Sequence, residues 1–309
     1  MHKTTKTMQF IKNFTDLKAF ISASSEKKVR VVAVCPHDDH TREAIEAAIN
    51  EGLAEFTLVG TPDKMGALPS LAAHLIEEAD TDRAAYLAVE EVRQGRADVM
   101  MKGLINTDNL LRAVLNKEHG LLPAGKVLTH ITAAQIPGHH KLLFFSDAAV
   151  IPFPKPEQRT AQVGYLAQVC RALGIEQPRI ALVHCTEKVS PKFPVTLDYE
   201  MLKEQCEQGL FGNAIVDGPM DAKTAVDIHS AQVKGIQSPI GGDADALLMP
   251  DIEAGNVFYK SLTCFAKAQI AGMLMGAACP VVLPSRGDST ESKLCSLALA
   301  CATSIALKQ

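Results

Sequence analysis

A serine, an arginine and an aspartate follow a short apolar run near the end of the sequence. The run covers residues 280–284 (PVVLP), and Ser285, Arg286 and Asp288 come shortly after it. Because a guanidinium is costly to bury without a partner, an arginine at the tip of a core strand indicates that an anion binds there. Arg286 can hold an oxyanion through two hydrogen bonds, and Ser285 can donate one to a carbonyl or phosphate oxygen. Asp288 has a second interpretation, as the N-cap of the last helix with Glu291 completing a capping box.

A lysine and a glycine follow the apolar run at residues 97–101 (ADVMM). Lys102 and Gly103 precede a helix that begins with Asn106, Thr107 and Asp108, residue types that cap a helix N-terminus. Ligands of parallel α/β sheets gather beyond the carboxyl ends of the strands, where helix N-termini also point, so this arrangement suits a phosphate or a carboxylate. A charged loop residue followed by an ordinary helix N-cap explains the same residues equally well.

Two aspartates are also predicted at strand ends. Asp147 follows LLFFS and Asp217 follows NAIV, in places where neither carboxylate is easily solvated. We expect Gly218 and Pro219 to form a tight turn after Asp217, and Asp221 to be the N-cap of the next helix. Asp147 and Asp217 are therefore candidates for ligand binding.

Asn256 and Lys260 lie one helical turn apart in the stretch PDIEAGNVFYKSL, at residues 250–262. This spacing predicts that the two side chains share one face of a helix. A ligand-binding face and a solvated face both explain the pair.

The segment PHDDH, at residues 36–40, suggests a metal site through His37 and His40. It stands between a strand and a helix that Asp39 or Thr41 is predicted to cap, and we favour the capping interpretation, so no metal is expected. No HExxH, Walker, GxSxG or GxGxxG motif follows a strand. This argues against protease, nucleotidase, esterase and Rossmann hydride-transfer activities.

The elements that position these residues are short β-branched runs alternating with amphipathic stretches. Strand, helix, strand in this rhythm predicts an α/β fold with mainly parallel sheets and helices on both faces. For 309 residues, two lobes are favoured over one core. The stretch at residues 252–276 is predicted as one long helix running into the last strand. The predicted strands cover residues 29–35, 55–60, 97–103, 126–131, 141–147, 179–185, 213–218, 244–250 and 279–285.

Composition narrows the possible partners. The net charge is −4 and aromatic residues make up 5% with no Trp, which argues against a nucleic-acid-binding protein. The eight cysteines form no CxxC pair, so we expect them to be reduced. No apolar stretch reaches the roughly 18 residues of a membrane span, and the first residues lack a signal-peptide core. We therefore expect a cytoplasmic protein that binds neither a membrane nor a nucleic acid.

Several of these stretches together resemble the phosphate acetyltransferase/butyryltransferase family, most closely its butyryltransferase branch. They are MKG, FSDAA, VDGPMDAKTAV, ADALLMPDIEAGNVFYKSL and GAACPVVLPSRGDSTESKLCSLALA, in matching order and spacing over nearly the whole chain. The resemblance implies an enzyme that interconverts an acyl-CoA plus phosphate with an acyl phosphate plus CoA. Coenzyme A is then a substrate, no cofactor is bound permanently, and the assembly is a homodimer or a higher homo-oligomer.

The resemblance also implies two α/β/α lobes of the isocitrate/isopropylmalate dehydrogenase type, with the active site in the cleft between them. The first lobe would comprise residues 1–135 and 276–309, and the second residues 136–275. A phosphate acetyltransferase is one alternative to a butyryltransferase. The nearest alternative from another class is a nicotinamide-dependent hydroxy-acid dehydrogenase of similar fold.

The resemblance assigns roles to the residues after the last strand. Arg286 would hold the phosphoryl group, and Ser285 would donate to the acyl oxygen as it becomes an oxyanion. The acetyl branch has an aspartate one turn further on that takes the thiol proton. The corresponding place here is Ser292, with Asp288 and Glu291 nearby, so Asp288 is a catalytic candidate and the base stays open.

Other arginines of the acetyl branch have no obvious counterpart, and Lys102 or His130 would replace them. We expect direct thiolate attack in a ternary complex without an acyl-cysteine, because proximity alone lowers such a barrier by roughly 7–11 kcal/mol. The acyl chain length is not fixed by these motifs, since each methylene changes binding by only about 0.8 kcal/mol. The other predicted substrate-binding residues are Gly103, Asp147, Asp217, Gly218, Pro219, Asn256 and Lys260.

Overall fold

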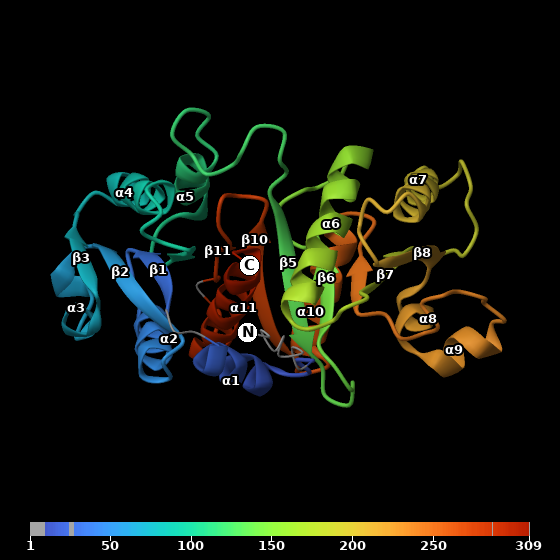
Figure 1. Cartoon of the computed structure of the whole chain (residues 1–309), viewed down its shortest axis with the longest axis horizontal. Helices are drawn as coiled ribbons and strands as arrows, with labels where there is room; N and C mark the ends of the chain where they lie inside the picture. The colour runs from blue at the N-terminus through green and yellow to red at the C-terminus, as the bar shows by residue number, and fades with distance from the viewer. Residues whose placement is uncertain (1–9, 25–27, 286, 309) are drawn as a thin grey trace, which may run out of the picture.

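The structure is a computed structural model, and it describes residues 10–24, 28–285 and 287–308 (Figure 1). Its α-helices are α1 (Phe14–Ser24), α2 (Asp39–Asn50), α3 (Leu68–Leu71), α4 (Thr81–Arg93), α5 (Thr107–Val114), α6 (Pro156–Ala172), α7 (Val195–Glu207), α8 (Ala222–Val226), α9 (Ile228–Val233), α10 (Ile252–Cys264) and α11 (Thr290–Leu307). Its strands are β1 (Val29–Val34), β2 (Ala54–Gly60), β3 (His74–Glu77), β4 (Val99–Lys102), β5 (Thr129–Gln135), β6 (Leu143–Ser146), β7 (Arg179–Val183), β8 (Ile215–Met220), β9 (Ala246–Leu248), β10 (Gln269–Met275) and β11 (Val281–Val282).

The strands form one sheet in the order β3-β2-β1-β4-β11-β10-β5-β6-β9-β7-β8, which spans the length of the molecule (Figure 1). The strands from β3 to β11 pair in parallel, and so do those from β6 to β8. Between these two blocks, β10 is antiparallel to β11 and to β5, and β5 is antiparallel to β6. The mixed, mainly parallel α/β fold expected from the alternating pattern is confirmed.

The predicted lobe boundaries fall at the ends of the two central strands. Residue 135 ends β5 and residue 275 ends β10, and these strands pair with each other along their whole length. The division into residues 1–135 with 276–309 and residues 136–275 stays a prediction. It places the join between the two lobes at the antiparallel centre of the sheet.

The last helix is buried on nearly every side. From Lys293 to Ser304 every residue of α11 is buried, because the helix packs against α1, α2, α6 and β10. A helix in such surroundings is expected to be apolar all round, as the sequence LCSLALACA is. This packing fixes the first turn of α11 against the start of α2. No helix among the described residues is long and apolar enough to cross a membrane.

The prediction of one long helix at residues 252–276 is wrong. Helix α10 ends at Cys264, Lys267 takes a left-handed conformation with φ of 54°, and the chain continues as β10. Strand β10 lies between β5 and β11 and is mostly buried, so it carries a continuous apolar run rather than an alternating one. Such a run cannot be told from a buried helix by periodicity alone.

The tight turn predicted at Gly218 and Pro219 is also wrong. Both residues lie within β8, which continues to Met220, so Asp217 is in the middle of a strand rather than at its end. Strand β8 is the edge of the sheet, where a proline is tolerated because no ladder hydrogen bond is lost. A register shift in the partner strand, between Ala181 and Val183, accompanies it. Asp221 caps α8 as expected, accepting a hydrogen bond from the Thr224 N–H.

Candidate active site

A cavity of about 150 Å³ lies against the central strands of the sheet. Its walls come from β5, β10, α10 and α11 and from the segments that follow β6 and β11. Both predicted lobes contribute to it. The lining residues are His130, Ala148, Ala149, Asn256, Tyr259, Lys260, Ile270, Gly272, Leu283, Pro284, Ser285, Asp288 and Ser296.

Ser285 and Asp288 form the part of the wall that follows β11. The Ser285 N–H donates to Asp288 Oδ2 at 2.7 Å, and the Asp288 N–H donates to the Ser285 carbonyl at 3.1 Å. The N-cap of α11 is Ser289, which accepts from the Ser292 N–H, so the prediction that Asp288 caps this helix is wrong. The Asp288 carboxylate instead holds the loop that carries Ser285. Arg286 lies outside the described residues.

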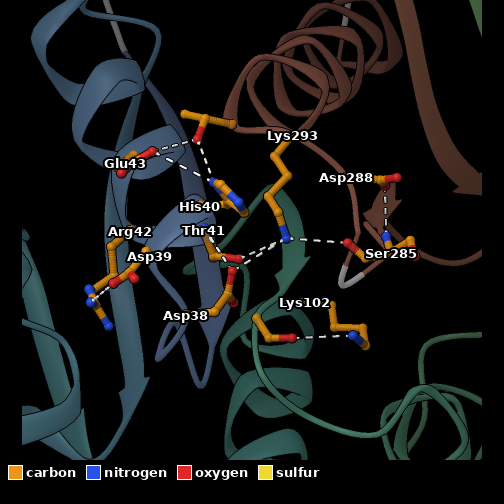
Figure 2. A network of polar contacts seen from close by, with 12 residues as sticks. Asp38, Asp39, His40, Thr41, Arg42, Glu43, Lys102, Ser285, Asp288 and Lys293 are labelled. Carbon is orange, nitrogen blue, oxygen red and sulfur yellow. Dashed lines mark hydrogen bonds and ion pairs between the residues drawn. The ribbon is translucent and has the colours of Figure 1, made fainter.

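A buried lysine holds this loop from the other side (Figure 2). The Lys293 side chain is 3% exposed, and its ammonium lies 3.2 Å from Thr41 Oγ1, 3.4 Å from the Ser285 carbonyl and 3.5 Å from Asp38 Oδ1. It therefore links the loop after β11 to the first turn of α2. Thr290 adds a second link between the two helices, because its hydroxyl donates to the Glu43 carboxylate at 2.5 Å.

Asp38 is the N-cap of α2, accepting from the Thr41 N–H at 3.0 Å, where Asp39 or Thr41 was predicted. Burial alone would raise the pKa of Asp38, but the hydrogen bonds from Thr41 and the charge of Lys293 outweigh it and lower the pKa. The carboxylate is therefore charged and partly neutralises the buried ammonium. Sequence reasoning missed Lys293, although a lone lysine within an apolar helix is a signal that it has a buried partner.

His130, the second residue of β5, also lines the cavity. Its Nδ1 is 3.2 Å from the Thr132 hydroxyl, and its ring lies over Gly272 of β10, where a Cβ would approach Nε2 to 2.7 Å. Burial lowers the pKa of His130, while the carboxylates of Asp147 and Asp288 oppose that shift. The imidazole is therefore neutral near pH 7, which suits a hydrogen-bonding or proton-accepting role better than a phosphate-binding cation.

Asp147 is buried beside the cavity rather than in its wall. Its carboxylate accepts from the Thr129 hydroxyl at 2.7 Å and from the main-chain N–H groups of Ala149 and Val150 at 2.8 and 3.0 Å. Weaker contacts come from the N–H groups of His130 and Ile151. These donors occupy the carboxylate, so Asp147 fixes the segment that carries Ala148 and Ala149 against the start of β5.

Helix α10 supplies the polar side of the cavity. Asn256 and Lys260 both line it, as their shared helical face predicted, and Asn256 also donates to the Ala148 carbonyl at 3.2 Å. The Lys260 ammonium lies 4.8 Å from the ring centre of Tyr259. Burial raises the pKa of Tyr259 to about 12, so its hydroxyl is a hydrogen-bond donor at neutral pH. Tyr259 was not predicted from the sequence.

Lys102 and Gly103 lie at the end of β4, near the Ser285 loop but outside the cavity wall (Figure 2). Lys102 is 3% exposed, and its ammonium donates to the Gly103 carbonyl at 3.2 Å. A Cβ on Gly103 would approach the Cys35 carbonyl oxygen to 2.2 Å, so the glycine is needed where the chain passes the loop after β1. The capped helix expected after Gly103 is present, with Asn106 as the N-cap of α5.

Asp217, Gly218 and Pro219 lie on edge strand β8, apart from the cavity wall. Asp217 accepts a hydrogen bond from the Ser238 hydroxyl at 2.6 Å and lies 3.8 Å from the Lys203 ammonium. Their assignment to substrate binding stays a prediction. The structure does not bring them together with Ser285.

The cysteines and the PHDDH histidines are not part of this wall. None of the described residues that line the cavity is a cysteine, and burial raises the pKa of Cys35 to about 11 and that of Cys279 to about 12. His37 Nε2 accepts from the Thr61 N–H at 3.2 Å, whereas His40 Nδ1 lies 3.1 Å from the Thr290 hydroxyl. Within the described ranges, no group of three or more His, Cys, Asp or Glu side chains is arranged to hold a metal ion.

The fold and the site together define an α/β protein with a polar loop beside a cavity at the centre of its sheet, and comparison with known proteins gives its family. The family described as "Phosphate acetyl/butaryl transferase" matches residues 71–301, and the chain belongs to it. The phosphate butyryltransferase of Clostridium acetobutylicum is 37% identical over 94% of this chain and 97% of its own. The phosphate acetyltransferase of Thermotoga maritima is 34% identical over 92% of this chain and 98% of its own.

Solved structures agree with the fold. A branched-chain phosphotransacylase from Enterococcus faecalis V583 has a TM-score of 0.81 at 29% identity, covering 89% of this chain and 99% of its own. A 4-hydroxythreonine-4-phosphate dehydrogenase from Klebsiella pneumoniae has a TM-score of 0.53 at 11% identity, covering 90% of this chain and all of its own. The similarity to the dehydrogenase concerns the fold alone. It agrees with the dehydrogenase-type architecture that the sequence resemblance to the phosphate acetyltransferase/butyryltransferase family implied.

Proposed function

We propose that this enzyme transfers a short acyl group between coenzyme A and inorganic phosphate, with butyryl or a related short or branched chain as the acyl group. The observation that carries the proposal is the Ser285–Asp288 loop opening onto a cavity shared by both predicted lobes, in a chain of this family. The 37% identity with a phosphate butyryltransferase supports the butyryl group.

In this proposal, the loop after β11 binds the phosphoryl end of the substrate. Arg286 neutralises the phosphate, and Ser285 donates to the acyl oxygen while it carries negative charge. Asp288 and Lys293 hold the loop from opposite sides, through the Ser285 N–H and the Ser285 carbonyl respectively. Lys102, 3% exposed at the end of β4, adds positive charge near the same loop.

The rest of the cavity wall receives the acyl chain and the end of coenzyme A. Ala148, Ile270 and Leu283 offer an apolar surface, while Asn256, Tyr259 and Lys260 offer hydrogen-bond donors. Coenzyme A and acyl phosphate would then meet in one ternary complex. The absence of a cysteine from the cavity wall supports direct attack of the thiol without an acyl-cysteine.

The experiment mixes the enzyme with butyryl phosphate and coenzyme A and follows thioester formation and loss of free thiol. Stoichiometric thioester is expected, and acetyl, propionyl, butyryl and isobutyryl phosphates compared at one enzyme concentration give the acyl preference. The highest kcat/KM with acetyl phosphate would favour a phosphate acetyltransferase instead. Absence of thioester, with a change in nicotinamide absorbance in the presence of a hydroxy acid, would support the dehydrogenase alternative.

A further inference from the structure

We propose that His130 accepts the proton of the coenzyme A thiol when the thiol attacks the acyl phosphate. This inference rests on the proposed function and adds the proton acceptor that the Ser285 loop does not supply. It is argued from the position of the imidazole in the cavity wall, the contacts that orient it and the groups that surround it.

The first step is access. His130 lines the cavity together with Ser285 and Asp288, and its ring lies over Gly272, which also lines it. A Cβ at position 272 would come within 2.7 Å of Nε2 and 3.0 Å of Cε1, so the missing side chain makes room for the imidazole. The Gly272 N–H donates to Ser296 Oγ at 2.9 Å, which anchors this part of β10 to α11. The Nε2 edge of the imidazole therefore lies against Gly272, a residue of the cavity wall.

The second step is orientation. Thr132, which is fully buried, places its hydroxyl 3.2 Å from His130 Nδ1. When Nδ1–H donates to that hydroxyl, Nε2 carries the free lone pair and can accept a proton. The His130 main chain is fixed as well, because its N–H donates to the buried carboxylate of Asp147 at 3.2 Å.

The third step is the electrostatic setting. Among the described residues, the charged and titratable groups around the imidazole are Asp147 after β6, Asp288 after β11, and Tyr259 and Lys260 on α10, while β10 contributes Ile270 and Gly272 to the cavity wall. Burial keeps the imidazole neutral and so able to take a proton. The two carboxylates then stabilise the imidazolium that forms. Asp288 is less suited to the same task, since its Oδ2 is occupied by the Ser285 N–H.

The reaction balances with these groups alone. The thiol proton moves to Nε2 as the sulfur bonds to the acyl carbon, and the carbonyl becomes an oxyanion facing Ser285. The oxyanion then collapses, the bond from carbon to the phosphate oxygen breaks, and the imidazolium gives its proton to the departing phosphate. The products are the thioester and hydrogen phosphate, and His130 is neutral again.

The test compares His130→Asn with the wild-type enzyme in thioester synthesis from butyryl phosphate and coenzyme A between pH 7 and pH 9.5. General-base removal is expected to reduce kcat/KM by about 10²-fold or more at pH 7. The loss should shrink as the pH passes about 8.5, because the thiol then ionises without help. A purely structural or phosphate-binding role predicts a loss that does not change with pH. His119→Gln, in an exposed loop, is the matched control and should match the wild-type profile.

A pH-independent loss in His130→Asn, or no loss, would overturn the inference. If this variant does not yield folded protein, Thr132→Val decides in the same way, since it keeps the imidazole but removes the acceptor of Nδ1–H. A deficit of about tenfold that narrows with rising pH supports the role of His130, and a constant deficit or none contradicts it. If the wild-type enzyme forms no thioester, the result contradicts the proposed function itself and not only the role of His130.

Discussion

Ser285 and Asp288 are joined by two hydrogen bonds that run in opposite directions, from the Ser285 N–H to the Asp288 carboxylate and from the Asp288 N–H to the Ser285 carbonyl. The pair closes the short segment that contains Arg286 in the sequence. Lys293 contacts the same Ser285 carbonyl at 3.4 Å. The loop is therefore held by its own residues and by α11 before any ligand binds.

The first prediction concerns the Asp288 side chain. Asp288→Asn keeps an oxygen that can accept from the Ser285 N–H, whereas Asp288→Ala removes the acceptor. We expect the kcat of Asp288→Asn to stay within a few-fold of the wild-type value. The kcat of Asp288→Ala should fall by about 10-fold to 10²-fold, because displacing a donor to the oxyanion reduces the rate by a factor of that size. Steady-state kinetics of both variants check this. Equal kcat values for the two variants would show that the hydrogen bond does not position Ser285.

The second prediction concerns the buried ammonium of Lys293. Lys293→Met is expected to lower the free energy of unfolding by about 1–3 kcal/mol, since it removes the cationic partner of the Asp38 carboxylate and one of the hydrogen bonds to the Ser285 carbonyl. Urea unfolding measures the change. Lys223→Met is a suitable control, because Lys223 is 72% exposed in its pair with Asp227 and such pairs contribute little.

A double-mutant cycle isolates the Lys293 ion pair. Asp38→Asn combined with Lys293→Met should destabilise the protein by clearly less than the sum of the two single changes, because each single change removes the same contact. Strictly additive changes would mean that the 3.5 Å approach between Asp38 Oδ1 and the Lys293 ammonium carries no energy.

The third prediction concerns stability and pH. Burial lowers the pKa values of His37, His130, His139 and His184 in the folded protein. The unfolded chain, with histidine pKa values near 6.5, therefore binds more protons than the folded chain below that pH. Stability is consequently expected to fall as the pH drops from about 7 toward 5. His184→Gln should make that decline shallower, as measured by urea unfolding at each pH. A free energy of unfolding that does not change between pH 7 and pH 5 would contradict this prediction.

The fourth prediction concerns the thiols. Cys185 and Cys264 are exposed, whereas Cys170 and Cys301 are buried, where burial raises their pKa values. Iodoacetamide at neutral pH should thus modify Cys185 and Cys264 first, as read by mass spectrometry of peptides. Turnover should be retained after this modification, because no cysteine lines the cavity. A butyrylated cysteine peptide trapped during turnover would refute the direct-attack mechanism.

The alternation of apolar and amphipathic runs was enough to predict the class of fold and nine of the strand positions. It did not reveal β10, because both faces of this strand are mostly buried and its apolar run shows no alternation. It also did not reveal β3, a largely exposed four-residue strand next to β2. The two missed strands are therefore a buried apolar run that follows directly on a helix, as β10 follows α10, and a short strand with little buried surface, as β3 is.

Parts of the candidate site could be predicted because their motifs are local. Ser285, Asn256 and Lys260 were found from short stretches, and the cavity brings them together. Lys293 and its partners Asp38 and Thr41 could not be paired from sequence, because some 250 residues separate them. The role of Asp147 was also hidden, since the donors that occupy its carboxylate are mostly main-chain N–H groups, which every residue type offers.

The central claim is that phosphate and coenzyme A meet at the Ser285 loop, and a crystal structure of the enzyme soaked with both ligands tests it most directly. We predict a phosphate within about 3 Å of the Ser285 hydroxyl and the Arg286 guanidinium, with the coenzyme A sulfur in the cavity beside His130. Both ligands bound elsewhere, with the cavity between α10 and the Ser285 loop left empty, would contradict the account.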